Sequence, residues 1–258
     1  MKLQLIQWNI KINSSVDRIV EFLRFKIREN TIINLQEVSE TNYQKISESL
    51  GIDCSYSLNL RKSGKYEGRN RQMGVMTLTN FGTITSSQLV NNSIFPERTL
   101  LTIIRNGNDK IMNLNFHSLT GVDYKKAKSS NFASIASFIY DNKIDIMSCD
   151  ANEPSVDSIK DDDIIFFDNR DKGKMASLLF GKDKIHDLVD SYKEFARLHL
   201  MEIENGYTHV TGGKKKRYDF IYCQKDWKIL YSEANYQESI KHTSDHALLE
   251  TYVEFVSG

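Results

Sequence analysis

The segment Ile144-Asp-Ile-Met-Ser-Cys-Asp150-Ala-Asn152-Glu-Pro154 is the most informative part of the sequence. Its apolar residues alternate at Ile144 and Ile146, and this period of two predicts a half-buried strand. The strand ends at Asp150 and Asn152, because Pro154 cannot continue a ladder of hydrogen bonds. Residues two apart share one face of a strand, so a carboxylate and a carboxamide leave its end side by side. Such a pair can hold a water and a phosphate oxygen, although an isolated Asp-x-Asn is more often a strand end with a turn.

Composition restricts the class of protein. The 258 residues contain 34 Lys and Arg and 34 Asp and Glu, so attraction for a polyanion must come from local clusters. Cys54, Cys149 and Cys223 are widely spaced and form no CxxC pair, which favours reduced thiols and a cytoplasmic protein. No apolar run approaches the length of a membrane segment, so we expect none. With two prolines and no low-complexity linker, we expect a single domain over residues 1–258.

Hydrophobic periodicity predicts an α/β plan with mixed sheets. The expected helices are Ser15 to Glu29, Thr41 to Leu50, Asp123 to Asn142 and Ile185 to Leu200. The expected strands are Lys2 to Ile10, Thr31 to Val38, Cys54 to Leu60, Met73 to Thr79, Gly82 to Val90, Arg98 to Arg105, Lys110 to His117, Tyr218 to Cys223, Ile229 to Glu233 and Ala247 to Phe255. Asn106-Gly107 is typical of a hairpin turn between two of these strands.

Polar side chains stand where many of these strands end: Asn9, Glu37, His117, Asp150 with Asn152, Asp219, and Asp245-His246. Functional groups concentrate at such positions on a rigid sheet. The oxygen donors suit Mg²⁺ or Mn²⁺, and the histidines could supply an acid and a base near neutral pH. A zinc site is not expected, because the sequence has neither a cysteine pair nor HExxH.

Six pieces of the sequence, in this order, resemble the endonuclease/exonuclease/phosphatase superfamily, the Mg²⁺-dependent phosphohydrolases that include DNase I and exonuclease III. They are Trp8-Asn9-Ile10, Leu35-Gln-Glu37-Val38, Asn115-Phe-His117, Asp150-Ala-Asn152, Arg217-Tyr-Asp219-Phe-Ile-Tyr222 and Ser244-Asp245-His246. Each alone would be a solvated strand end in most proteins, but together they span essentially the whole chain. The resemblance implies a DNase I-like four-layer αββα sandwich, in which helices flank two packed mixed β-sheets.

The resemblance also implies a metal site. Glu37 is expected to be the principal ligand of Mg²⁺ or Mn²⁺, and Asn9 and Asp245 to support the metal and the phosphate. In-line attack on a phosphodiester requires neutralisation of charge on the phosphate oxygens, which such a cation supplies.

Catalytic roles follow from the same resemblance. Asp150 and Asn152 position the water and the scissile phosphate. Asp219 holds His246, which acts as general base or otherwise polarises the nucleophile. His117 takes the place where DNase I-like members carry a leaving-group acid.

Some positions depart from the family pattern. Cys149 stands where the family usually has Gly before Asp-x-Asn, and Ile10 follows Trp-Asn where exonuclease III-like members have Asn, which argues against abasic-site repair. DNase I pairs its acid histidine with a glutamate just before a strand. The nearest candidates here are Gln72 and Glu67, so the partner of His117 is unassigned.

Two basic loops, 61–71 and 211–217, bear on the substrate class. The expected phosphate contacts are Arg61, Lys65, Arg69, Arg71, Arg98, Lys216 and Arg217. Such clusters could track a nucleic-acid backbone, or they could be solvated charged loops.

We therefore expect a divalent-metal-dependent nuclease that hydrolyses phosphodiester bonds of DNA or RNA by in-line attack of an activated water. The alternative is a phosphatase or phosphodiesterase for a small phosphorylated metabolite or lipid headgroup. A non-catalytic binding protein ranks third, because every catalytic position carries a competent residue. The motifs distinguish neither DNA from RNA nor endonuclease from exonuclease, and nothing in the sequence indicates the oligomeric state.

Overall fold

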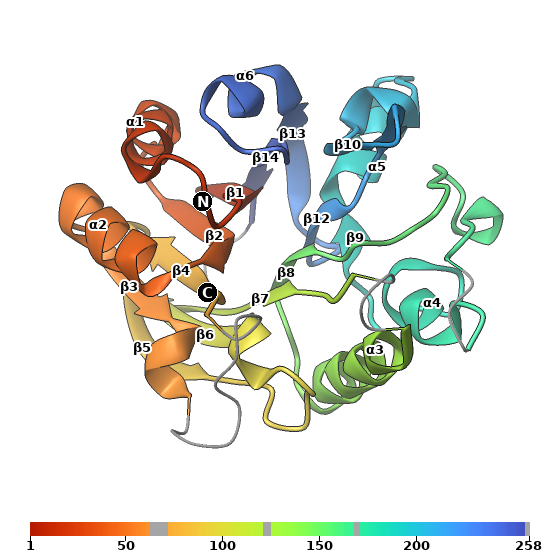
Figure 1. Ribbon diagram of the computed structural model, residues 1–258, viewed down its shortest axis with the longest axis horizontal. Helices are drawn as coiled ribbons and strands as arrows, with labels where there is room; N and C mark the ends of the chain where they lie inside the picture. The colour runs from red at the N-terminus through yellow and green to blue at the C-terminus, as the bar shows by residue number, and fades with distance from the viewer. Residues whose placement is uncertain (62–71, 121–124, 168–170, 256–258) are drawn as a thin grey trace.

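Two β-sheets pack face to face, with helices on their outer faces (Figure 1). The computed structural model describes residues 1–61, 72–120, 125–167 and 171–255, and over these residues each sheet has six strands. The first sheet has the order β13 (Lys228–Asn235), β14 (Leu248–Glu254), β1 (Lys2–Asn9), β2 (Thr31–Val38), β4 (Gly74–Thr79) and β3 (Asp53–Tyr56). The second has the order β5 (Thr83–Gln88), β6 (Thr99–Asn106), β7 (Asp109–His117), β8 (Ile146–Asp150), β12 (Asp219–Cys223) and β9 (Val189–Asp190). The expected four-layer sandwich of the DNase I-like fold is confirmed.

Parallel pairing occurs in each sheet where a helix joins neighbouring strands. Helix α1 (Val16–Lys26) connects β1 to the parallel strand β2, and α3 (Lys125–Asp141) connects β7 to the parallel strand β8. A tight turn instead joins β6 to β7, so that Asn106 pairs with Asp109, as expected of the hairpin at this position. Because the pairs are parallel, the carboxyl ends of β1 and β2 lie together, and so do those of β7 and β8.

The outer layers are held by apolar contact. Helices α1 and α2 (Glu40–Leu50) cover one sheet through residues such as Ile19, Leu23 and Ile46. Helix α3 and α4 (Lys174–Phe180) cover the other sheet through Phe132 and Phe180. Within the described ranges, no helix is both long enough and apolar enough to cross a bilayer.

Side chains between the two sheets change from apolar to polar along the strands. Leu3, Ile32 and Ile146 belong to the apolar end. Further along the strands, buried amides bond across the interface: Asn34 to Asn113 at 2.8 Å, Gln36 to Asn115 at 2.8 Å, and Gln7 to Asp219 at 3.0 Å. Each buried amide keeps its partner only at one alignment, so this network fixes the register of one sheet against the other. The network also includes Asp219, one of the charged residues at the strand ends.

Three expectations of local structure were wrong. The strand expected to run from Cys54 to Leu60 ends at Tyr56, and a 3₁₀ turn, Ser57–Leu60, follows it. The helix expected from Ile185 begins as α5 (Ser191–Leu198), because the Asp190 side chain caps it by accepting hydrogen bonds from the next turn. The basic loop at 211–217 is a hairpin, in which β10 (His209–Thr211) pairs with β11 (Lys214–Lys216).

Candidate active site

Four strand ends meet around one buried carboxylate. Asp150, at the end of β8, accepts a hydrogen bond from Asn9 Nδ2 at 2.8 Å, and His117 Nε2 lies 3.5 Å from the same oxygen. Glu37, at the end of β2, accepts from the same Asn9 amide at 3.3 Å and lies 3.9 Å from His117 Nε2. The structure therefore brings together four of the residues expected at the site.

The orientation of Asn9 corrects its expected role as a metal ligand. The backbone N–H of Lys11 donates to Asn9 Oδ1 at 2.9 Å, which turns the NH₂ group of the amide towards Glu37 and Asp150. An NH₂ group cannot coordinate a cation. Asn9 therefore holds two carboxylates close to each other, and the carboxylates are the atoms left for a metal.

Asp219 and His246 form the expected pair. His246 Nδ1 lies 2.8 Å from Asp219 Oδ2, and both residues are buried. Burial by itself lowers the pKa of His246, but the carboxylates of Asp219 and Asp150 outweigh it and raise the pKa to about 10. His246 therefore carries its proton at neutral pH. This argues against the general-base role and leaves the other expected role, in which His246 polarises the nucleophile.

His117 is in the opposite state. Burial lowers the pKa of His117 to about 3, with Arg98 acting in the same direction against the opposing effect of Asp150. The ring is therefore neutral near pH 7 and cannot protonate a leaving group. This disagrees with the expected role of His117 as the leaving-group acid. Among the described residues His117 Nδ1 has no hydrogen-bond partner, so its partner is still unassigned. Gln72 is exposed, and Glu67 lies outside the described residues.

Burial also raises the pKa of the Asp150 carboxyl, and the Asp219 carboxylate adds to this against the opposing charge of His246. Its second oxygen accepts from the backbone N–H of Asn152 at 3.0 Å. A carboxylate with a raised pKa is a better proton acceptor than an ordinary aspartate. Asp150 is consequently the better candidate for the base.

Several backbones at this site are in the left-handed region that non-glycine residues rarely adopt. Glu37 has φ +57°, Asn152 φ +50°, Lys11 φ +55° and Thr243 φ +73°. Such conformations persist only where surrounding contacts impose them, and they cluster at functional sites. The left-handed backbone of Glu37 and Asn152 gives their side chains a direction that differs from that of a side chain in regular extended strand.

A buried ion pair holds the backbone of Asn152 in position. Lys128 of α3 pairs with Glu153 at 2.8 Å and donates to the Asn152 carbonyl at 2.6 Å, and both charged side chains are 0% exposed. The Phe167 N–H donates to the second oxygen of Glu153. Burial lowers the pKa of the Lys128 ammonium, although Glu153 opposes this. No local pattern in the sequence marks Lys128, because its partners lie 24 or more residues away.

Ser244 joins β1 to the segment before β14. Its hydroxyl donates to the Asn9 carbonyl at 2.6 Å and accepts from the His246 N–H at 3.1 Å. The Trp8 indole donates to the His246 carbonyl at 3.0 Å. These contacts explain why Trp8 and Ser244 stand beside the site residues in the sequence.

The donors present fit a hard divalent cation. Glu37 and Asp150 offer carboxylate oxygens that share Asn9 and His117 as neighbours. Mg²⁺ is usually held by one or two carboxylates and keeps several waters. Asp245, expected as a further ligand, instead lies near His209 and His246, and its carboxylate is 3.2 Å from Lys11 Nζ.

The expected phosphate contacts are only partly available. Arg217 is buried and donates hydrogen bonds to both carboxylate oxygens of Asp190 at 2.5 Å and to Asp157 at 2.6 Å. Its guanidinium also lies over the Phe220 ring. Arg217 therefore connects loops of the protein and cannot reach a substrate. Lys216 donates to the Ser155 carbonyl. The remaining positions divide as follows: Arg61 is half-buried, Arg98 is buried within range of His117, and Lys65, Arg69 and Arg71 lie outside the described residues.

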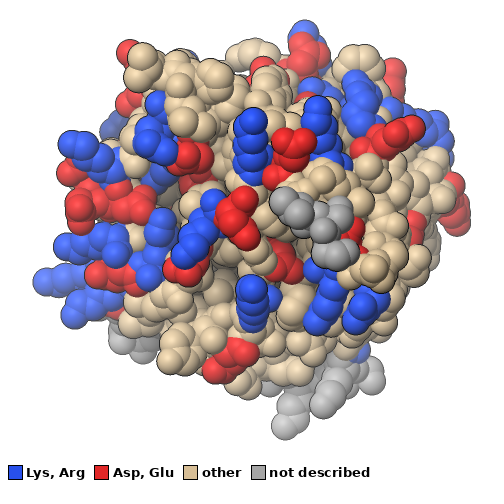
Figure 2. Space-filling model, turned by 180° about the vertical axis from the view of Figure 1, so that it is seen from behind, with Lys and Arg blue, Asp and Glu red and all other residues tan. Residues whose placement is uncertain are grey.

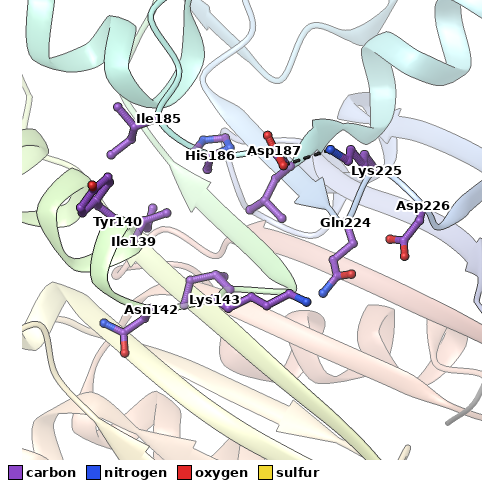
Figure 3. Close-up of a pocket in the computed structure, with 12 residues that line it drawn as sticks. Ile139, Tyr140, Asn142, Lys143, Ile185, His186, Asp187, Gln224, Lys225 and Asp226 are labelled. Atoms are coloured by element: carbon purple, nitrogen blue, oxygen red, sulfur yellow. Dashed lines mark hydrogen bonds and ion pairs between the residues drawn. The ribbon is translucent and has the colours of Figure 1, made fainter.

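A surface cavity of about 530 Å³ lies at the other end of the second sheet. Its lining includes Gln224, just after β12 (Figure 3), and Ile144, just before β8. Asp150 and Asp219 stand at the opposite ends of these two strands. Two of the charges at its edge pair with each other, since Lys225 bonds Asp187 at 3.0 Å. The chemistry is therefore concentrated at the strand ends and not in this cavity.

The fold is shared with proteins of known structure. The chain has the DNase I-like fold of the endonuclease/exonuclease/phosphatase superfamily. Solved structures of that fold match nearly its whole length, and they include D. rerio TDP2 complexed with single strand DNA product, with a TM-score of 0.69, 11% identity, and coverage of 98% of this chain and 99% of that chain. An endonuclease/exonuclease/phosphatase from Bacteroides vulgatus matches with a TM-score of 0.66, 14% identity, and coverage of 99% and 100%. The human Nocturnin catalytic domain with bound sulfate anion matches with a TM-score of 0.66, 15% identity, and coverage of 99% and 95%. No protein-family model and no curated protein sequence matches the chain.

Proposed function

We propose that the protein is a divalent-metal-dependent phosphodiesterase that hydrolyses nucleic acid by in-line attack of an activated water. The observation that carries this proposal is the meeting of Glu37, Asp150 and His117 around the Asn9 amide, beside the Asp219–His246 pair. Burying charged groups costs stability. The presence of Asp150, Asp219 and the two histidines in one buried group therefore favours catalysis over a binding role on an inactive scaffold.

The two histidines and Asp150 have different roles because their protonation states differ. Asp150, with its raised pKa, accepts the proton of the attacking water. His246, protonated and held by Asp219, stabilises charge on the phosphate and can give its proton to the departing oxygen. Neutral His117, whose Nε2 lies 3.5 Å from the carboxylate, packs against Asp150 and restricts its position. A cation held by Glu37 would supply charge neutralisation and water activation.

Nucleic acid is favoured as substrate by the solved DNA complex of D. rerio TDP2, which shares the fold. Against it, two of the expected backbone contacts are engaged elsewhere, since Arg217 and Lys216 bond to the protein itself. Lysine and arginine side chains are interspersed with acidic ones on the face turned away from the viewer in Figure 1, as Figure 2 shows. Because Arg217 and Lys216 bond to the protein, a small phosphoester is the second candidate substrate.

Hydrolysis assays test the proposal. The purified protein would be incubated with supercoiled plasmid, single-stranded DNA, RNA and bis-nitrophenyl phosphate, each with Mg²⁺, Mn²⁺ or EDTA. Metal-dependent cleavage that is lost in Glu37→Gln is expected. Hydrolysis of the nitrophenyl diester without cleavage of any polymer would select the small-phosphoester alternative, and no hydrolysis of any substrate would refute the proposed activity.

A further inference from the structure

A histidine outside all the expected motifs joins the edge of this site. His209 begins β10, and its ring stacks on His246 with centroids 4.4 Å apart and planes at 28°. One ring nitrogen from each histidine and one carboxylate oxygen of Asp245 all lie within 4.8 Å of one another. We propose that His209, Asp245 and His246 form a binding site for a borderline transition-metal cation of the Zn²⁺ or Co²⁺ class.

Both histidines are arranged as metal-ligating histidines usually are. His209 Nδ1 lies 3.0 Å from the Asp245 carbonyl, and His246 Nδ1 lies 2.8 Å from the Asp219 carboxylate. Each Nδ1–H therefore has an acceptor, and Nε2 of each ring is left for a cation. Histidine ligands typically donate their other ring N–H to a carboxylate or a backbone carbonyl, which orients the ring and makes it more basic. The structure provides one partner of each kind.

Backbone pairing places His209 there. His209 forms an antiparallel bridge with His246, and the Ala247 N–H donates to the Thr208 carbonyl at 2.7 Å. The His209 ring also stacks on Tyr218, at 5.8 Å between centroids. The position of this imidazole is therefore fixed before any cation binds, so little ordering is needed on binding.

The donor set selects the class of cation. Imidazole nitrogens suit Zn²⁺, Co²⁺ or Ni²⁺, whereas Mg²⁺ prefers oxygen ligands. Donors at about 2.1 Å from one cation lie no more than roughly 4.2 Å apart, so atoms that now lie up to 4.8 Å apart must approach by about 0.6 Å at most. His209 and Asp245 are half-buried, so solvent reaches both. The Lys11 ammonium opposes a cation here, but it is 46% exposed and free to move into solvent.

Occupancy of this site has a consequence that rests on the proposed function. A cation on His246 must displace the ring proton, because imidazole binds metal in its neutral form. The bound cation would then remove the acid that His246 supplies to the departing oxygen. Zn²⁺ is therefore expected to inhibit Mg²⁺-supported hydrolysis.

Binding measurements separate this site from the one at Glu37. Zn²⁺ calorimetry and the visible spectrum with Co²⁺ would be recorded on Glu37→Gln, which leaves the three proposed ligands intact. Adding His209→Ala to that background should weaken Zn²⁺ binding at least 10-fold and abolish the spectrum of nitrogen-coordinated Co²⁺. Adding His199→Ala, which changes an exposed histidine elsewhere, should change neither. Asp245→Asn is the second variant, should His209→Ala lose its native circular dichroism.

Two results would overturn the proposal. One is unchanged Zn²⁺ affinity in both the His209 and the Asp245 variants, and the other is Co²⁺ binding that leaves the imidazole NMR signals of His209 and His246 unshifted. In wild type, the Zn²⁺ concentration that halves Mg²⁺-supported turnover should rise about 10-fold on His209→Ala. Absence of any turnover would sink the proposed function and leave the binding result standing.

Discussion

Replacing Lys128 with methionine should destabilise the fold strongly. Lys128 and Glu153 are both fully buried, so Lys128→Met removes the Lys128 ammonium from the Glu153 carboxylate and the Lys128 donor from the Asn152 carbonyl. Breaking a buried pair by removing one partner costs about 3–5 kcal/mol. In a chain of this size each kcal/mol shifts Tm by roughly 2–4 °C, so Tm should fall by about 6–20 °C.

A double-mutant cycle measures the pair directly. Glu153→Gln keeps an acceptor for the Phe167 N–H but removes the charge. The double variant with Lys128→Met should therefore lose less than the sum of the single losses, with a coupling of about 0.5–3 kcal/mol from urea unfolding. Lys241→Met is the matched control, because its pair with Glu238 is exposed and should be worth less than about 1 kcal/mol.

A stabilising Lys128–Glu153 pair is refuted if Lys128→Met lowers the free energy of unfolding no more than Lys241→Met does. It is also refuted if the losses of the two single variants simply add. At temperatures where Lys128→Met is folded, turnover should drop even for a minimal diester, because Asn152 is no longer held in its left-handed conformation. Unchanged kcat in the folded variant would show that Lys128 does not position Asn152.

The remaining predictions concern the site residues. Glu37→Gln should abolish hydrolysis while moving Tm by no more than about 2 °C, since a substitution at this partly exposed position is worth roughly 0.5 kcal/mol; full activity in the variant or in EDTA would refute its role as metal ligand. His117→Ala should lower turnover of nitrophenyl and natural esters alike, because a neutral His117 supports Asp150 and does not protonate the leaving group; selective rescue by nitrophenolate would reinstate the acid role. In EDTA, ¹⁵N NMR should find His246 protonated at pH 8, and Asp219→Asn should bring its titration down towards the ordinary value of about 6.5; loss of the proton below pH 7 in wild type would contradict the protonation we assign. Arg217→Met should cost about 3–5 kcal/mol in unfolding experiments and leave the salt dependence of DNA binding unchanged; a flatter salt dependence would return Arg217 to the substrate contacts.

Local pattern determined much of the fold. The period of two in β1, β2, β7 and β8 is a property of neighbouring residues, and each strand formed close to its expected bounds. Helix ends were less certain, since the cap that starts α5 depends on Asp190 and not on the apolar pattern before it. The polar residues at strand ends could be predicted from the sequence because the alternating apolar pattern shows where each strand ends.

Tertiary structure decided what those residues do. The raised pKa of His246 and the lowered pKa of His117 come from burial and from charges that other strands bring close. Arg217 looks like part of a solvated basic loop in the sequence, yet Asp157 and Asp190 close over it. His209 reaches His246 through a bridge between segments 37 residues apart. Contacts across such separations depend on how the sheets pack, and no local pattern in a single sequence encodes them.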